Sequence, residues 1–284
     1  MRLLLEAWAA CHSVIAAARE ETRAAVFDEL IRFGLELESQ SAAQVGEGFS
    51  GRPEADAFLE SDPNAFLLGV LFTQGIPAER AWAGPWELKR RLGHLDLSKL
   101  ASDLEAVQEA VQRPPMLHRF KNTLPRWISS AAKRLLAEWD GDAALIWAPG
   151  THVADVTERL SAFEGIGRKK AVMAVQILLR HFHVALAGRE AGRVAYDVQT
   201  RRVFLRSGLV EVDSVDSIEA AAIEGYAPAP GILDLPAWLI GRQTCRPALP
   251  KCDECRLGKV CPRRTWLNPE GVGLRRGKEP TRLI

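Results

Sequence analysis

Four of the five cysteines gather near the C-terminal end of the sequence, with the spacing C-x6-C-x2-C-x5-C. Clustered cysteines in a protein of a reducing compartment favour a metal or iron–sulfur site over disulfides. Zinc sites more often use two C-x2-C pairs, whereas only Cys252 and Cys255 form such a pair here. The pattern therefore predicts a 4Fe–4S cluster, with zinc as the alternative. The predicted ligands are Cys245, Cys252, Cys255 and Cys261.

Basic residues surround these cysteines. Residues 241–284 carry 11 basic and 4 acidic side chains, although the whole chain has a net charge of only +1. Lys251 and Arg256 lie inside the cysteine loop, where a bound cluster would hold them in a fixed shape. We expect them to contact phosphates. Alternatively, they only offset the negative charge of the thiolates.

A second candidate site is the turn Gly165-Ile166-Gly167, which lies between two segments with helical patterns. The glycines allow a tight turn, and the first amides of the following helix can hold a phosphate. The turn predicts a helix-hairpin-helix that grips a DNA backbone through Gly165, Gly167, Arg168 and Lys170. A plain turn between helices is the alternative.

Lys169 and Asp197 are the candidate catalytic residues. Lys169 falls in the first turn of the helix after the glycines, next to two other cations, where a nucleophilic amine is favoured. Asp197 precedes another predicted helix, as an N-cap would. Its carboxylate could also stabilise an oxocarbenium-like transition state at a sugar C1′. The alternatives are that Lys169 only binds phosphate and that Asp197 is only a cap.

The elements that position these residues are helices, because strand-like alternation of apolar and polar residues is rare along the chain. Pro and Gly punctuate the helical patterns, and residues 40–56 resemble a linker. The sequence thus predicts an all-α protein. The helical segments are residues 3–37, 64–72, 77–92, 102–112, 124–138, 152–162, 168–183, 198–206, 214–224 and 233–241.

No apolar run reaches the roughly 20 residues that span a bilayer. Glu6 and His12 interrupt the apolar N-terminus, which argues against a cleaved signal peptide. We expect a cytoplasmic monomer without membrane contact.

Taken together, these motifs resemble those of the endonuclease III family of helix-hairpin-helix DNA glycosylases. The cysteine spacing is that of the family's cluster loop. FEGIGRKKA is similar to its hairpin and AYDVQTRRVF to the segment with its catalytic aspartate, which places Lys169 and Asp197 on the catalytic positions. FLLGVLFTQGIPAERAW is similar to the helix and loop whose glutamine fills the gap left by an extruded base, here Gln74. The segment after Pro115 resembles the region of the intercalating wedge, which gives three candidates: Leu117, His118 and Arg119.

The resemblance implies two helical domains. A six-helix domain, residues 56–192, would carry the hairpin, and residues 1–55 with 193–284 would form the iron–sulfur cluster domain from both chain ends. The active site would lie in the cleft between them.

The implied activity is base-excision repair of double-stranded DNA that carries a damaged base or an abasic site. The damaged nucleotide would be flipped out of the stack. Lys169 would attack C1′ with help from Asp197, and the Schiff base would permit strand cleavage. Two alternatives stay open: a monofunctional glycosylase that uses Asp197 and water, and a DNA-structure-binding protein without catalysis.

Several positions near the expected lesion pocket depart from the family pattern. Glu164, Ser161 and Gln199 stand where proline, glutamate and histidine are usual. The reaction type is therefore better defined than the damaged base. An oxidised pyrimidine is the default substrate, and uracil, an alkylated base or an oxidised purine are the alternatives.

Overall fold

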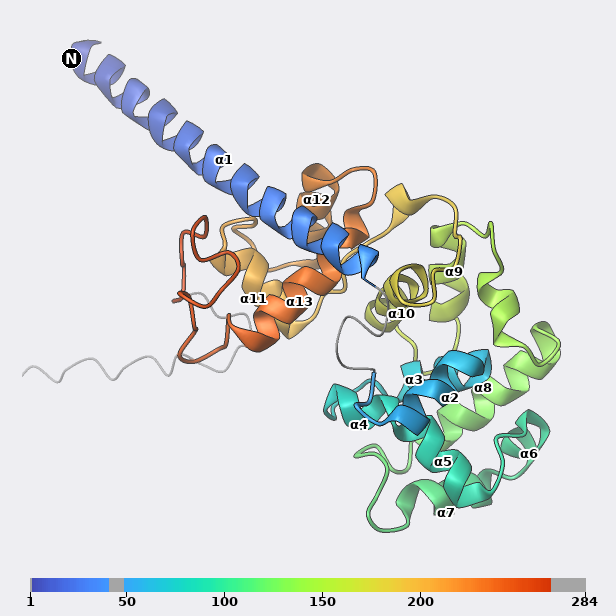
Figure 1. Cartoon of the computed structure of the whole chain (residues 1–284). Coiled ribbons are helices and arrows are strands. Elements are labelled where there is room, and N and C mark those ends of the chain that lie inside the picture. The colour runs from blue at the N-terminus through green and yellow to red at the C-terminus, as the bar shows by residue number, and fades with distance from the viewer. Residues whose placement is uncertain (1, 41–48, 267–284) are drawn as a thin grey trace, which may run out of the picture. The chain divides into compact units, whose positions relative to one another are not determined.

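The computed structural model describes residues 2–40 and 49–266, with side chains from residue 16 onward. In these ranges the regular elements are helices, and one isolated β-bridge joins His152 and Ala187 (Figure 1). The predicted all-α fold class is confirmed. The elements are α1 (Arg2–Ser39), α2 (Pro53–Ser61), α3 (Pro63–Phe72), α4 (Ala78–Trp82), α5 (Gly84–Leu92), α6 (Leu97–Ser102), α7 (Leu104–Gln112), α8 (Leu124–Glu138), η1 (Ala143–Trp147), α9 (Val153–Ser161), α10 (Arg168–Arg180), η2 (Arg189–Ala191), α11 (Val198–Arg206), α12 (Val215–Gly225), η3 (Pro230–Leu233) and α13 (Asp234–Gln243).

The chain divides into two compact units. Unit 1 contains Met1–Leu35 and Tyr196–Ile284, and unit 2 contains Glu36–Ala195. Each is described by itself below. The predicted domains, residues 56–192 and residues 1–55 with 193–284, stay a prediction about which parts fold independently.

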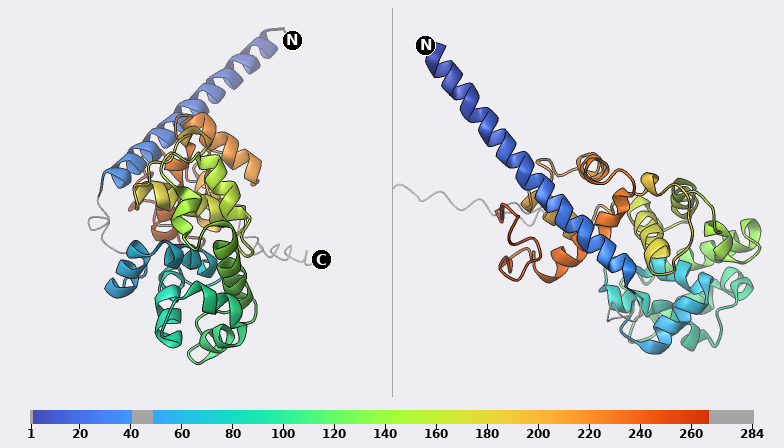
Figure 2. Two further views of the ribbon diagram at one scale, coloured as in Figure 1. Left: turned by 90° about the vertical axis from the view of Figure 1, so that its right-hand side faces the viewer. Right: turned by 45° about the horizontal axis from the view of Figure 1, so that its top comes forward.

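Helix α3 forms the centre of unit 2. Each of its residues from Ala65 to Phe72 is buried, as expected for a helix that is apolar all round. Asp62 caps its N-terminus by accepting hydrogen bonds from the amides of Asn64 and Ala65, and Pro63 begins the helix. The helices α2, α4, α5, α8 and η1 pack against α3, and Figure 2 shows this group in two further views.

Two local differences from the predicted helices in unit 2 have physical reasons. The predicted helix 77–92 is interrupted at Ala83, because Pro85 lacks an amide hydrogen and stands in the first turn of a new helix, α5. The short helices α2 and α6 were not predicted. Pro53 starts the former, and Asp96 caps the latter by accepting a hydrogen bond from the Lys99 amide.

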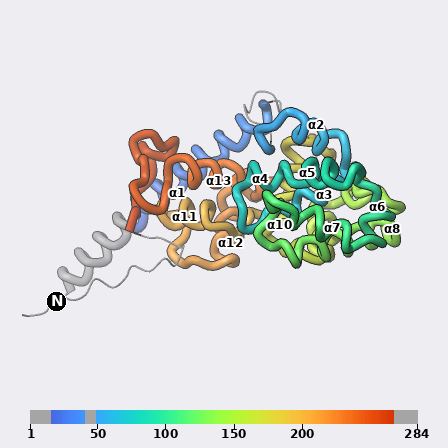
Figure 3. The backbone as a smooth tube through the Cα atoms, turned by 90° about the horizontal axis from the view of Figure 1, so that it is seen from below, coloured from blue at the N-terminus to red at the C-terminus, as the bar shows by residue number. Residues whose placement is uncertain are grey.

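Unit 1 is built around α11 and α13, which pack side by side, and α12 packs against η3. The second half of α1 belongs to the same core, with Val26, Phe27 and Leu30 buried. Arg23 of α1 makes an ion pair with Glu224 of α12 at 2.7 Å. The segment after α13 coils into a compact loop beside that helix (Figure 3).

Among the residues that the structure describes, no helix has both the length and the apolar character needed to cross a bilayer.

Candidate functional site

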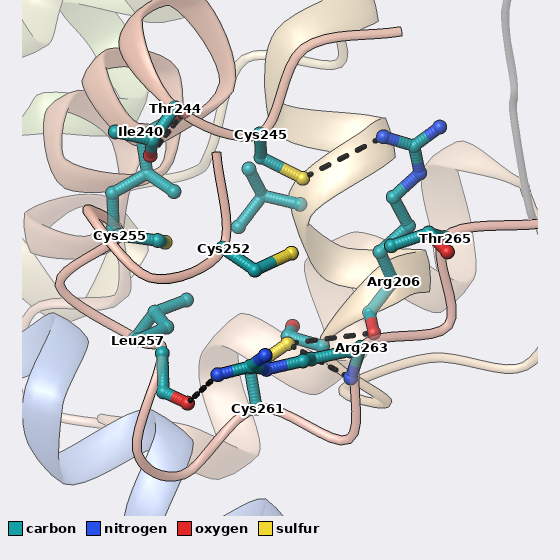
Figure 4. A pocket seen from close by; sticks show the side chains of 13 residues that line it. Arg206, Ile240, Thr244, Cys245, Cys252, Cys255, Leu257, Cys261, Arg263 and Thr265 are labelled. Carbon is teal, nitrogen blue, oxygen red and sulfur yellow. Dashed lines mark hydrogen bonds between the residues drawn. The ribbon is translucent and has the colours of Figure 1, made fainter. Parts of the chain in front are cut away.

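The four predicted cysteine ligands line one pocket of unit 1 (Figure 4). They come from the loop that follows α13, and Val203 and Ile240 of the neighbouring helices line the same pocket. No set of three or more metal-ligating side chains is already drawn together for an ion in the described part of the chain. The fold therefore brings the four thiols to one place.

Two fully buried arginines of α11 hold the start of this loop. Arg202 donates to the Cys245 carbonyl at 2.6 Å and to the Gly241 carbonyl at 2.7 Å. Arg206, one helical turn later, donates to the Arg246 carbonyl at 2.6 Å and to the Pro247 carbonyl at 2.9 Å. A guanidinium has five N–H donors in a fixed plane, so it can satisfy several carbonyls at once.

The surroundings of the thiols fit a metal–sulfur centre. The Cys245 Sγ atom lies 3.9 Å from Nη1 of Arg206, and the amide of Arg263 donates to Cys261 Sγ at 3.3 Å. Hydrogen bonds of this kind stabilise thiolate ligands. Burial raises the pKa of the Cys245 thiol and raises that of Cys261 to about 11. The positive charge of a bound metal would lower these two thiol pKa values again, as it usually does where cysteines ligate a metal.

Asp197 is the N-cap of α11, as its position in the sequence predicted. Its Oδ1 atom accepts hydrogen bonds from the amides of Gln199 at 2.8 Å and Thr200 at 2.9 Å. The carboxylate is half-buried and belongs to unit 1. The cap fixes its orientation relative to the helix.

A polar cluster next to Asp197 was not predicted. Asp213 accepts hydrogen bonds from the Tyr196 hydroxyl at 3.1 Å and from Nε of Arg201 at 2.8 Å. The guanidinium of Arg201 also lies over the Tyr196 ring, 4.5 Å from its centroid. The hydrogen bond from Arg201 lowers the pKa of Asp213, and burial raises that of Tyr196. This polar cluster thus holds Tyr196, the residue directly before Asp197.

The predicted hairpin turn lies between α9 and α10 in unit 2. Gly165 has φ +87°, and a Cβ atom there would lie 2.5 Å from Cδ2 of Trp127, so only glycine fits. A Cβ on Gly167 would meet open space. Gly167 is the N-cap of α10, and no side chain caps this helix. Backbone atoms therefore form the exposed side of the turn, and this is the arrangement by which helix N-termini bind phosphate.

The two adjacent lysines after the turn have opposite environments. Lys169 is exposed, and so is its neighbour Arg168. Lys170 is only 6% exposed, and its Nζ donates to the carbonyls of Leu71 at 2.8 Å and Gly165 at 2.9 Å. Burial, together with the charge of Lys169, lowers the pKa of Lys170 to about 8.

The other predicted DNA contacts of unit 2 lie around the C-terminal end of α3. Gln74 is exposed, two residues after the last residue of that helix. His118 is fully buried, and its Nε2 lies 3.1 Å from the Phe72 carbonyl. Leu117 is buried too, whereas Arg119 is exposed and donates to the Gly75 carbonyl at 3.4 Å. Of the three wedge candidates, Arg119 is thus the one at the surface.

The two basic residues predicted in the cysteine loop both make ion pairs within unit 1. Lys251 pairs with Glu254 at 2.7 Å. Arg256 pairs with Glu29 of α1 at 2.9 Å, and its guanidinium lies 4.3 Å from the centroid of the Phe33 ring. The acidic N-terminal segment therefore supports the cysteine loop.

Sequence reasoning missed the structural roles of Arg202, Arg206 and Lys170. A signal was present in each case. The two arginines are four residues apart, on one helix face. Lys170 precedes the buried Ala174 by four residues, which places it on the apolar face of α10.

Comparisons with known proteins identify the fold. No protein-family model matches the sequence, and the search of curated proteins found no match. The structure is similar to an endonuclease III trapped as a covalent intermediate with DNA, with 18% identity, 75% of this chain and 93% of that chain covered, and a TM-score of 0.55. It is also similar to a thermostable thymine-DNA glycosylase, with 11% identity, 88% and 100% covered, and a TM-score of 0.56.

Both comparisons cover most of this chain and nearly all of the other, so the likeness is not limited to the hairpin. The expected resemblance is confirmed for the fold: the chain has the helix-hairpin-helix fold of the endonuclease III type of DNA glycosylase.

Proposed function

We propose that this protein is a base-excision repair glycosylase that acts on a damaged base in double-stranded DNA, with Lys169 as its nucleophile and Asp197 as its catalytic carboxylate. The observation that carries the proposal is the exposure of Lys169 directly after an uncapped hairpin turn, while the neighbouring Lys170 is buried. The hairpin would hold one phosphate and thereby bring one sugar to Lys169.

The proposed reaction begins with a nucleotide flipped out of the duplex. The neutral amine of Lys169 attacks C1′, the bond from C1′ to the base breaks, and the base leaves with the bonding electrons and a proton. Asp197 stabilises the positive charge that develops on the sugar. The lone pair of the nitrogen on C1′ then breaks the bond from C1′ to O4′, O4′ takes up a proton from solvent, and a protonated Schiff base forms. Removal of a C2′ proton then expels the 3′ phosphate by β-elimination.

Lys169 belongs to unit 2 and Asp197 to unit 1, so the proposal requires that both act on one nucleotide. Gln74 would fill the place of the extruded base and Arg119 would enter the duplex beside it. Gly165, Gly167 and Arg168 would contact phosphates. Lys170, which the sequence also predicted in this DNA grip, would instead support the turn from inside, because its buried ammonium donates to backbone carbonyls. Lys251 and Arg256, which already make ion pairs with carboxylates, would add positive potential near the DNA instead of forming the main contacts.

We also propose that Cys245, Cys252, Cys255 and Cys261 hold a 4Fe–4S cluster. Support comes from the donor set, from the shared pocket and from the N–H groups near two of the sulfurs. The cluster would fix the shape of the basic loop and could transfer electrons. Absorbance near 400 nm with iron and acid-labile sulfide in the purified protein is expected, and zinc without iron would contradict the assignment.

Borohydride trapping tests the catalytic assignment. The duplexes would carry an abasic site, thymine glycol, uracil, 8-oxoguanine, hypoxanthine or an alkylated base. A covalent adduct is expected with at least one of them, and Lys169→Ala should abolish it. Asp197→Asn should slow base release, whereas Lys133→Ala, which changes an exposed lysine of α8, should leave both unchanged.

Two other outcomes would change the proposal. Alkali-labile sites without an adduct would identify a monofunctional glycosylase in which water attacks C1′. Binding to damaged DNA without base release from any duplex would favour a DNA-binding protein without catalysis.

A further inference from the structure

The C-terminal end of α3 is a junction of three segments that the proposed function uses. Lys170 joins it to the hairpin, because one ammonium donates to both the Leu71 and the Gly165 carbonyl. His118 joins it to the 116–120 segment through the Phe72 carbonyl, at 3.1 Å from Nε2. Residues 73–76 follow α3 directly, and this segment is called the Gln74 turn.

Both joining side chains suit this place. The carbonyls at the last turn of a helix have no partners within the helix, and the helix dipole favours a positive charge there. Lys170 supplies donors and a charge, and Trp127 of α8 covers it, with Nζ 5.3 Å from the ring centroid. Trp127 also packs against Gly165, so the lysine and the hairpin share one wall.

We infer that Lys170 is a positioning residue for the proposed reaction, and that it fixes the hairpin relative to the Gln74 turn so that an unstacked nucleotide is bound in preference to a paired one. The inference rests on the proposed function. Lys170 touches neither base nor sugar in this scheme. It sets the distance between the phosphate grip at Gly165 and Gly167 and the side chain that replaces the flipped base.

The expected consequence is a loss of discrimination and not a general loss of DNA binding. The backbone amides of the hairpin remain in a Lys170→Met variant, so binding to intact duplex should change little. Binding to a duplex with a tetrahydrofuran abasic site requires the hairpin and Gln74 to act on the same nucleotide, and it should weaken. A lysine that served stability alone would lower the melting temperature and leave the ratio of the two affinities unchanged.

The test measures fluorescence anisotropy with the full chain and two duplexes that differ only in the tetrahydrofuran site. We expect the preference for that site to fall about tenfold in Lys170→Met and less in Lys170→Gln, whose amide still donates. Lys170→Arg should recover part of the preference, and Lys133→Met should retain all of it. Thermal melting identifies the variants that are folded. If Lys170→Met does not fold, the preference of Lys170→Gln for the tetrahydrofuran duplex is the result that tests the inference.

The outcomes separate this inference from the proposed function. A wild-type preference that all folded Lys170 variants retain would overturn the positioning role alone. A wild-type protein without any preference for the tetrahydrofuran duplex would overturn the proposed function, and the positioning role with it.

Discussion

The cysteine loop of unit 1 and the hairpin turn of unit 2 are both held by buried cations, but the cations differ. Arg202 and Arg206 hold the cysteine loop through the carbonyls of residues 241 and 245–247. Lys170 bridges the hairpin turn to α3 through two backbone carbonyls. Arginine stays charged even when buried and distributes its donors over a plane, whereas a buried lysine loses its charge readily.

Because of this difference, the two loops should respond differently to pH. The cysteine loop is fixed by two guanidinium groups, each of which donates to at least two carbonyls. The hairpin is fixed by a group with a pKa of about 8, so its placement should depend on pH. Four predictions test this comparison.

The largest effect is expected for Arg202→Met. Four acceptors within unit 1 would lose their donor: the carbonyls of Val198, Gly241 and Cys245 and the Gln199 side chain. The loss of these hydrogen bonds at a fully buried side chain should lower the free energy of unfolding by about 4 kcal/mol. Urea unfolding measures this change, and Arg32→Met, at an exposed arginine of α1, serves as the control. A loss below about 1 kcal/mol would mean that the loop is held by other contacts.

The second prediction concerns the pH dependence of stability. The folded-state pKa of Lys170, about 8, lies below its ordinary value of 10.5, so the unfolded chain binds more protons between these values. The cost of burying the charge is therefore fully present below pH 8 and disappears as the pH rises towards 10.5. Relative to Lys170→Met, the wild type should gain about 2 kcal/mol between pH 7.5 and pH 10.

Urea midpoints of the two proteins at both pH values provide the measurement, because other titrating groups cancel in the difference. Lys169 and His118, the titratable groups that lie next to Lys170, are present in both proteins. A difference that does not change with pH would place the Lys170 pKa near its ordinary value, and the contrast with the arginines would fail.

The third prediction compares the two glycines of the hairpin. Gly165→Ala combines a left-handed backbone with a contact of 2.5 Å to Trp127 and should cost about 2 kcal/mol. Gly167→Ala meets open space with ordinary φ and should cost less than about 1 kcal/mol. Thermal unfolding of the two variants shows the order. Equal costs would indicate that Trp127 moves aside.

The smallest effect is expected for Arg256→Ala on the cysteine loop. Its ion pair with Glu29 is one-third exposed on the arginine side, and such pairs contribute roughly 0–1 kcal/mol. Lost packing on Phe33 adds to this. The free energy of unfolding should fall by about 1 kcal/mol. A loss as large as that of Arg202→Met would show that α1, and not the buried arginines, holds the loop.

Local sequence signals predicted most of the helices. Asp197 as an N-cap and Gly165 in a tight turn follow from the chemistry of a single residue, and the structure has both. Helix α6 was missed because six residues form too short a window for a periodic pattern. The interruption at Ala83 depends on Pro85, which is a local signal that a longer apolar pattern concealed.

The candidate site was predicted less completely. The residue types and their spacing identified the cysteines, the hairpin and the lysine pair. They did not show that Leu117 and His118 are buried while Arg119 is exposed, because all three belong to a segment without regular periodicity. In the cluster of Tyr196, Arg201 and Asp213, the aspartate follows the other two residues by 17 and 12 positions, and it lies outside the helix that contains Arg201, so no local pattern predicts it.

By itself, the sequence determined which chemical groups this protein has and in which turns and helices they stand, because ligand spacing, glycine conformations and helix caps depend on neighbours along the chain. Only the tertiary structure decided which of two adjacent lysines is exposed to solvent. Successive residues of a helix point about 100° apart, so Lys169 and Lys170 occupy different faces of α10. The packing of α3 and α8 buries one of these faces and leaves the other in water.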